Sequence, residues 1–246
     1  SSALTYGCET WGSNVNDTEL CYRSGLKTAL NVRQNLNNEI VYLETGKWPL
    51  YSRIKKAQLK FWLNMNDYAL EHPDSAFAKV LHIGLNSNIG YLRHYENLQT
   101  QFNDPITCQK SIEQDLLDSY KRSMETALET DADSRLGTYY RVNPTLEKYV
   151  PKPQPTLEIE RELVTRYRTG SHSLAIELGR YSNTARENRV CCCGNGTQSV
   201  WHLFTECPLT HPIVDHQSYS NLCEVFGDGD VHRKLLMICS KLKIAI

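Results

Sequence analysis

The chain has 246 residues, of which 40% are hydrophobic and 22% are charged, and its formal net charge is −1. This composition is typical of a soluble globular protein with one or two domains, and it argues against a disordered chain or a polybasic tail. No run of about 18 apolar residues occurs, so no membrane span is expected. A net charge near zero still permits locally basic surfaces.

Hydrophobic spacing predicts a mainly helical chain. The segment 37–46 has Asn38 as a candidate cap and Gly46 just past its end, while Pro49 suits the first turn of the next helix. Segment 109–129 carries apolar residues at every fourth position. In chain order, helices are predicted in 16–32, 37–46, 48–70, 73–85, 109–129, 156–167 and 231–246.

A break between helices is predicted after residue 129. The stretch TDADSRLGTYYRVNP, residues 130–144, is followed by VPKPQPT, residues 150–156, and four prolines lie among residues 144–155. Such stretches are typical of linkers and loops. We therefore expect a domain boundary here, with one domain in 1–150 and a second in 151–246.

Basic residues gather in two parts of the chain, although the whole is nearly neutral. Residues 45–66 contain five basic side chains and no acidic one, and a second group of arginines lies between 161 and 189. Both groups are candidates for phosphate contacts, while the alternative is an ordinary solvated helix face. The predicted nucleic-acid-binding residues are Lys47, Arg53, Lys56, Lys60, Arg166, Arg168, Arg180, Arg186 and Arg189.

The segment RVCCCGNGTQSVWHLFTEC, residues 189–207, combines four cysteines with a histidine. Three thiolates and one imidazole are a suitable ligand set for tetrahedral Zn²⁺, and the two glycines after the cysteines favour a tight turn. The alternative is a group of free cysteines beside a packed histidine. We predict that Cys192 is a spacer and that the zinc ligands are Cys191, Cys193, His202 and Cys207.

Residues 171–210 resemble the C-terminal zinc-binding region of LINE-type non-LTR retrotransposon reverse transcriptases. In that family an L-x-I-E-x-G-R stretch precedes an arginine, a cysteine pair and an H-x4-C spacing. Residues 4–12, LTYGCETWG, resemble the segment that follows the polymerase palm, and residues 30–63 resemble the thumb-side segment. The matching positions of the zinc region are Leu174, Ile176, Glu177, Gly179, Arg180, Arg189, Cys191, Cys193, Gly194, His202 and Cys207.

The resemblance implies a helical thumb-like region in 1–150 and a C-terminal helical segment in 151–246. The second would contain a small CCHC zinc-knuckle-like module around 189–210. It further implies binding of nucleic acid, either an RNA template or target DNA. The palm and fingers of a parent polyprotein, an RNA-directed DNA polymerase, would be the protein partners.

Catalytic residues are not expected in this chain, because it contains no Asp-Asp pair of the kind that binds two Mg²⁺ ions in a polymerase palm. We therefore expect no polymerase or endonuclease activity from the chain alone. The odd number of cysteines, nine, favours reduced thiols and therefore an intracellular location of the protein, in the cytoplasm or the nucleus. The alternative function is a non-catalytic helical scaffold or interaction module whose zinc is purely structural.

Overall fold

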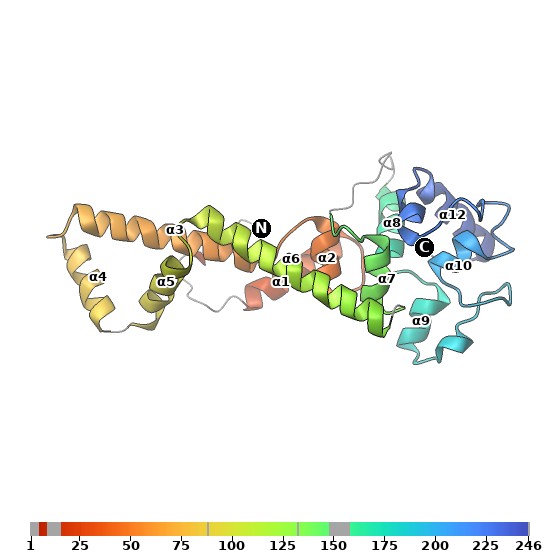
Figure 1. Ribbon diagram of the computed structural model, residues 1–246, viewed down its shortest axis with the longest axis horizontal. Helices are drawn as coiled ribbons and strands as arrows, with labels where there is room; N and C mark the ends of the chain where they lie inside the picture. Colours follow the sequence, from red (N-terminus) through yellow and green to blue (C-terminus); the bar gives the residue numbers. More distant parts are fainter. Residues whose placement is uncertain (1–4, 9–15, 88, 132, 148–157, 246) are drawn as a thin grey trace. The chain divides into compact units, whose positions relative to one another are not determined.

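The structure is a computed structural model that describes residues 5–8, 16–87, 89–131, 133–147 and 158–245. Within these ranges the chain forms helices joined by loops, and an isolated β-bridge pairs Val190 with Thr197 (Figure 1). The predicted mainly helical fold is confirmed. None of the described helices combines the length and the apolar character needed to cross a membrane.

The chain divides into two compact units that differ from the predicted domains. Unit 1 comprises residues 1–24 and 48–120, and unit 2 comprises 25–47 and 121–246. The predicted boundary at 150 therefore separates residues that belong to one unit. Much of the predicted linker, and most of the 4–12 stretch that carries the N-terminal resemblance, lie outside the described residues.

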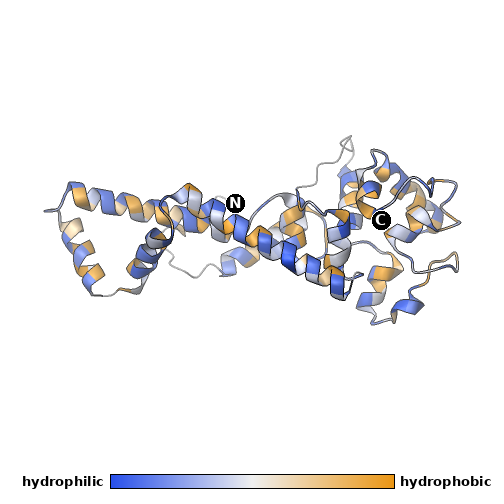
Figure 2. Cartoon of the chain, viewed as in Figure 1, coloured by the Kyte–Doolittle hydropathy of each residue, from blue (hydrophilic) through white to orange (hydrophobic). Residues whose placement is uncertain are grey.

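Unit 1 is built on the long helix α3 (Leu50–Glu71), against which α4 (Ala76–Asn86) and α5 (Gly90–Gln101) pack. Two more helices, α1 (Asn16–Ala29) and α6 (Pro105–Thr130), are each divided between the units. Hydrophobic residues recur between hydrophilic ones along α3 and α6, which is typical of amphipathic helices (Figure 2). One hydrophobic core cluster of this unit contains Leu59, Trp62, Leu81, Leu92, Tyr95, Leu98 and Cys108.

Unit 2 centres on α8 (Glu158–Thr169), which packs against α2 (Asn38–Thr45), α7 (Arg135–Val142) and α12 (Val231–Leu242). Helix α11 (Leu222–Gly227) packs against both α7 and α12. The shorter helices α9 (Ala175–Tyr181), η3 (Arg186–Asn188) and α10 (Val200–Thr205) complete the unit. Cys191 and Cys207 belong to its hydrophobic core.

A buried ion pair joins α2 to α8 and explains why residues 25–47 belong to unit 2. The Arg168 Nε donates to Glu44 Oε1 at 2.8 Å, and both side chains are less than 5% exposed. The Tyr139 hydroxyl of α7 donates to Glu44 Oε2 at 2.9 Å. Burial, followed by the charge of Glu44, holds the pKa of Tyr139 well above its usual range. One carboxylate therefore connects three helices.

The helices that the sequence analysis predicts are present, with shifted ends. The cap of α2 is Asn37 rather than Asn38, and Gly46 ends the helix with a left-handed φ of 59°. Helices α5, α7, α9, α10 and α11 are additional. Helix α7 lies within the predicted break 130–144, where Ser134 caps it by accepting from the Gly137 N–H at 3.0 Å.

Replacing Glu44 with Gln is expected to lower the free energy of unfolding by about 3 kcal/mol, because it leaves the buried Arg168 charge uncompensated. Urea denaturation followed by circular dichroism measures this change. The control is Asp230→Asn, which removes the carboxylate of an exposed pair with Arg233 and should cost about 0.5 kcal/mol or less. Equal losses in the two variants would contradict the role assigned to Glu44.

Candidate metal centre

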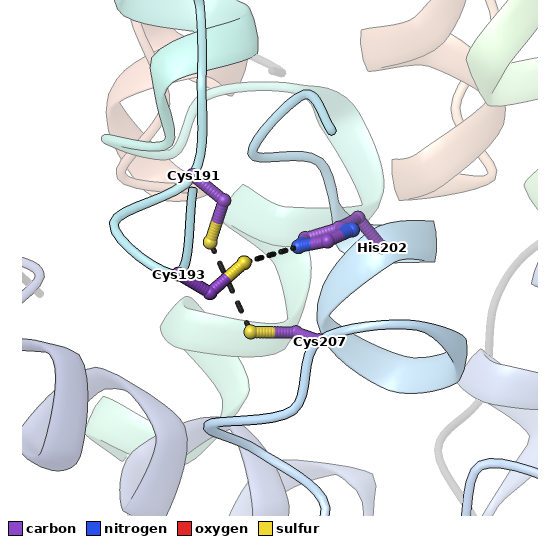
Figure 3. A group of neighbouring side chains, drawn as sticks. All are labelled: Cys191, Cys193, His202 and Cys207. Carbon is purple, nitrogen blue, oxygen red and sulfur yellow. Dashed lines mark hydrogen bonds between the residues drawn. The ribbon is translucent and has the colours of Figure 1, made fainter. Parts of the chain in front are cut away.

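Cys191, Cys193, His202 and Cys207 converge on one point of unit 2 (Figure 3). Their four ligand atoms all lie within 4.8 Å of one another. The Sγ atoms of Cys191 and Cys207 are 3.9 Å apart, and Cys193 Sγ lies 3.3 Å from His202 Nε2. The structure thus brings together the four predicted ligands in a group that could hold a metal ion.

A tight hairpin presents the first two cysteines. The Cys191 N–H donates to the Gly196 carbonyl at 2.9 Å, and the Gly194 N–H donates to the Cys191 carbonyl at 2.9 Å. Gly194 and Gly196 have φ values of 80° and 72°, which glycine adopts without a steric penalty. The turn leaves Cys192 exposed and outside the group, in line with its predicted role as a spacer.

Helix α10 and the residues just after it supply the other two side chains. Ser199 caps the helix by accepting from the His202 N–H at 3.2 Å, and the Cys207 N–H donates to the His202 carbonyl at 2.8 Å. The Glu206 carboxylate lies 3.1 Å from His202 Nδ1, while Nε2 faces the sulfur atoms. A carboxylate at this position fixes the orientation of a ligating imidazole.

The two hairpin cysteines differ in acidity. Burial raises the pKa of Cys193, but the Asn195 N–H and the His202 side chain outweigh it and lower the pKa to about 7. The Asn195 N–H donates to Cys193 Sγ at 3.4 Å. Burial instead raises the pKa of Cys191 well above its usual range. Cys193 is therefore the readier thiolate, and a bound cation would favour deprotonation of Cys191.

Arg189 anchors the hairpin to α9. Its Nη2 and Nε donate to the Thr184 carbonyl at 2.8 and 3.0 Å, and its Nη1 donates to the Ile176 carbonyl at 3.2 Å. A Cβ at Gly179 would lie 2.4 Å from Arg189 Nε, so only glycine leaves room for this side chain. The packing of the Arg189 side chain against Gly179 thus explains the glycine and the last arginine of the G-R…R pattern in residues 171–210.

Two arginines that were predicted to contact nucleic acid have internal roles. The nitrogen atoms of Arg189 donate to backbone carbonyls, and Arg168 is 4% exposed and pairs with Glu44. Both guanidinium groups bind partners within the chain, so neither Arg168 nor Arg189 belongs to a nucleic-acid-binding surface. His172, which lies within the resembling segment 171–210, is also buried, with 4% of its surface exposed. Burial and the nearby Arg33 lower its pKa to about 3, which keeps it neutral.

The remaining predicted residues keep accessible side chains. Arg166 and Arg180 are half-buried, and Arg180 donates to Glu177 and to the Asp133 carbonyl. The Arg186 side chain is 63% exposed and pairs with Asp133. Lys56 is half-buried, and the exposed members are Lys47, Arg53 and Lys60.

Two neighbours of the basic group in α3 are buried. Lys55 Nζ lies 2.9 Å from His94 Nε2, and burial lowers the pKa of Lys55. Trp62 is 1% exposed and stacks on Tyr95 at a centroid distance of 5.8 Å. Neither side chain can contribute to a surface on this helix.

Unit 2 contains a cavity of about 330 Å³ that was not predicted from the sequence. His202 and Glu206 form part of its wall, and Arg135 and Arg141 of α7 line it with three other arginines. Both α7 residues fall in the stretch predicted as a break. The serine cap at 134 followed by buried Tyr139 and Val142 was the signal that could have identified this helix.

Comparison of the chain with protein-family models, with curated proteins and with solved structures finds no match.

Replacing Gly179 with Ala is expected to destabilise unit 2 by about 2 kcal/mol, because the new methyl group would displace the Arg189 side chain. The free energy of unfolding measures the effect. Gly25→Ala is the matched control, since a methyl group at this helical glycine would have no atom within 4 Å and should stabilise the chain by up to about 1 kcal/mol. A harmless Gly179 variant would contradict the anchoring role of Arg189.

Proposed function

We propose that the four-ligand group is a zinc site. Two thiolates bound to zinc at about 2.3 Å in tetrahedral geometry lie ~3.8 Å apart, and the Cys191–Cys207 sulfur distance is 3.9 Å. Three cysteines and one histidine are the soft and borderline donors that select zinc over magnesium or calcium. The close match of this distance carries the proposal.

The role of this zinc is structural. Catalytic zinc sites keep one position open for water or substrate, whereas four protein ligands complete the tetrahedron. Cys191 and Cys207 are 3% and 0% exposed, which limits access by a substrate. Zinc would hold the hairpin to α10 and so support the surrounding arginine-bearing elements α9 and η3.

The function we propose for the chain is nucleic-acid binding, as the C-terminal portion of a LINE-type reverse transcriptase without its polymerase palm. The support is the order of the three resembling stretches, together with basic side chains that remain accessible. Those side chains are Lys47, Arg53, Lys56, Lys60, Arg166, Arg180 and Arg186. RNA is the favoured ligand, because a knuckle with adjacent arginines suits single-stranded or structured RNA.

Catalysis is assigned to the parent polyprotein in this proposal. The palm and fingers would carry the carboxylates for polymerisation, and this chain would hold the RNA template or target DNA. An intracellular location, in cytoplasm or nucleus, accords with nine cysteines that have no disulfide partner among the described residues.

A helical scaffold with a purely structural zinc is the second candidate. The internal roles of Arg168 and Arg189 favour it, because they reduce the positive charge that is available to a ligand. The net charge of −1 also favours it. Binding measurements distinguish the two candidates, since the scaffold has no need of phosphate contacts.

The purified chain should contain one zinc ion, as measured by native mass spectrometry and elemental analysis. Cys193→Ser and His202→Ala should each lose the zinc, because three remaining ligands bind it much more weakly. Cys192→Ser, the exposed neighbour, is the control and should keep it. A parent chain without zinc, or a Cys192 variant that alone loses it, would reject the ligand set.

Affinity for single-stranded RNA should fall steeply as salt rises, because phosphate contacts release counterions. Substituting Ala for Arg53, Lys56 and Lys60 together should reduce the slope of log K against log salt by about 2. The control replaces three exposed basic residues of α6, Lys110, Lys121 and Arg122, and should change the slope less. Salt-independent or undetectable binding would favour the scaffold.

A further inference from the structure

The 330 Å³ cavity of unit 2 has an unusual concentration of positive charge. Its wall comes from the turn before α7 and from each helix from α7 to α11, with η3 included. Among the lining side chains, five arginines face three carboxylates. The lining arginines are Arg135, Arg141, Arg168, Arg180 and Arg186.

The side chains that line the cavity carry one positive charge in excess. Glu44 neutralises Arg168, and Glu206, which contacts His202, adds a third negative charge to those of Asp133 and Glu177. The other four arginines share two carboxylates. Arg135 and Arg180 both pair with Glu177, and Arg141 and Arg186 both pair with Asp133.

The two carboxylates differ in exposure to solvent. The Glu177 side chain is 4% exposed, and its distance to Arg135 is 2.8 Å. The Asp133 side chain is 31% exposed and lies on a turn, with Arg141 at 3.4 Å and Arg186 in closer contact. Because Asp133 is the more accessible carboxylate, it is the anion that an incoming ligand could displace, and its partners Arg141 and Arg186 would then contact that ligand.

We propose that this cavity binds a phosphate monoester, whose oxygens take the place of the Asp133 carboxylate between Arg141 and Arg186, with Arg180 beside them. A phosphate monoester is a dianion near neutral pH, which matches the two positive charges that are in excess once Asp133 is displaced. Guanidinium groups bind phosphate oxygens through paired N–H donors, so two arginines suit one phosphate group.

The size of the cavity suits the terminal nucleotide of a nucleic-acid strand better than an internal nucleotide. A volume of about 330 Å³ is at the lower limit of small-ligand pockets, so one nucleotide fits but a continuing strand on both sides does not. The half-buried Trp201 also lines the cavity and offers an aromatic surface for a base. The phosphate monoester could be the terminal phosphate of a nucleic acid or a free mononucleotide. The nucleic-acid end as ligand rests on the proposed function.

The test compares RNA strands of about 12 nucleotides that carry a 5′-phosphate, a 3′-phosphate or no terminal phosphate, by fluorescence anisotropy with the zinc-loaded chain. A terminal phosphate should tighten binding roughly tenfold, as for one charge-assisted contact. Inorganic phosphate, added at constant ionic strength, should compete away that gain. Uridine monophosphate, titrated by calorimetry, tests the free nucleotide as the source.

Two substitutions should move the terminal-phosphate gain in opposite directions. Arg186→Gln should abolish most of the gain, while Asp133→Asn should increase it about threefold by removing the competing carboxylate. Arg233→Gln, which removes an arginine that is 72% exposed in α12 of the same unit, is the control and should leave it unchanged. Strands without a terminal phosphate should lose less affinity with Arg186→Gln than strands that carry one, because only one backbone-phosphate contact among several is removed.

The proposal is overturned if no terminal phosphate tightens binding and neither inorganic phosphate nor uridine monophosphate binds. It is also overturned if Arg186→Gln acts no more strongly than Arg233→Gln. Salt-dependent binding of the unphosphorylated strand, measured in the same experiment, reports separately on the proposed nucleic-acid function. Uridine monophosphate binding without a gain from strand ends would assign the cavity to the free nucleotide.

Discussion

The convergence of three sulfur atoms and one imidazole nitrogen on a single point is the constraint on which the C-terminal half of unit 2 depends. Ligand atoms within 4.8 Å of one another bring together a glycine-rich hairpin and a helix of six residues, Val200–Thr205. Neither segment is long enough to be stable alone in water. The hairpin is anchored through Arg189 to α9, and α9 carries Glu177, which holds Arg135 and Arg180. A short series of contacts therefore connects the arginines around the cavity to the candidate metal centre.

The four members of the candidate metal centre could be selected from sequence because few residue types bind zinc. The fold brings Cys191, Cys193, His202 and Cys207 together in a group that could hold a metal ion. Long amphipathic helices such as α3 and α6 were also predictable, since their periodicity repeats over many turns. The short helices α7 and α9 were not predicted, because they have too few turns for a periodic signal and are stabilised by packing within unit 2. The equally short α2 was predicted from the residues at its two ends.

The roles of the arginines could not be predicted, because a positive charge in a sequence does not identify its partner. Arg168 has glutamates on its own helix, yet it pairs with Glu44, 124 positions away. Arg189 satisfies backbone carbonyls in and after α9, a role that only the three-dimensional approach of the hairpin reveals. The division into units has the same origin: residues 25–47 belong with 121–246 because of such long-range contacts.

His202 and Glu206 belong both to the metal centre and to the wall of the arginine-lined cavity. Without a metal, the His202 ring would keep only its contacts with Cys193 and Glu206, and α10 would lose the metal bond that positions this wall of the cavity. Metal binding and phosphate binding would then be linked. If a metal orders the wall and thereby raises affinity for a phosphate, the phosphate must raise affinity for the metal by the same factor. A structural metal would in this way contribute to binding without contacting the ligand.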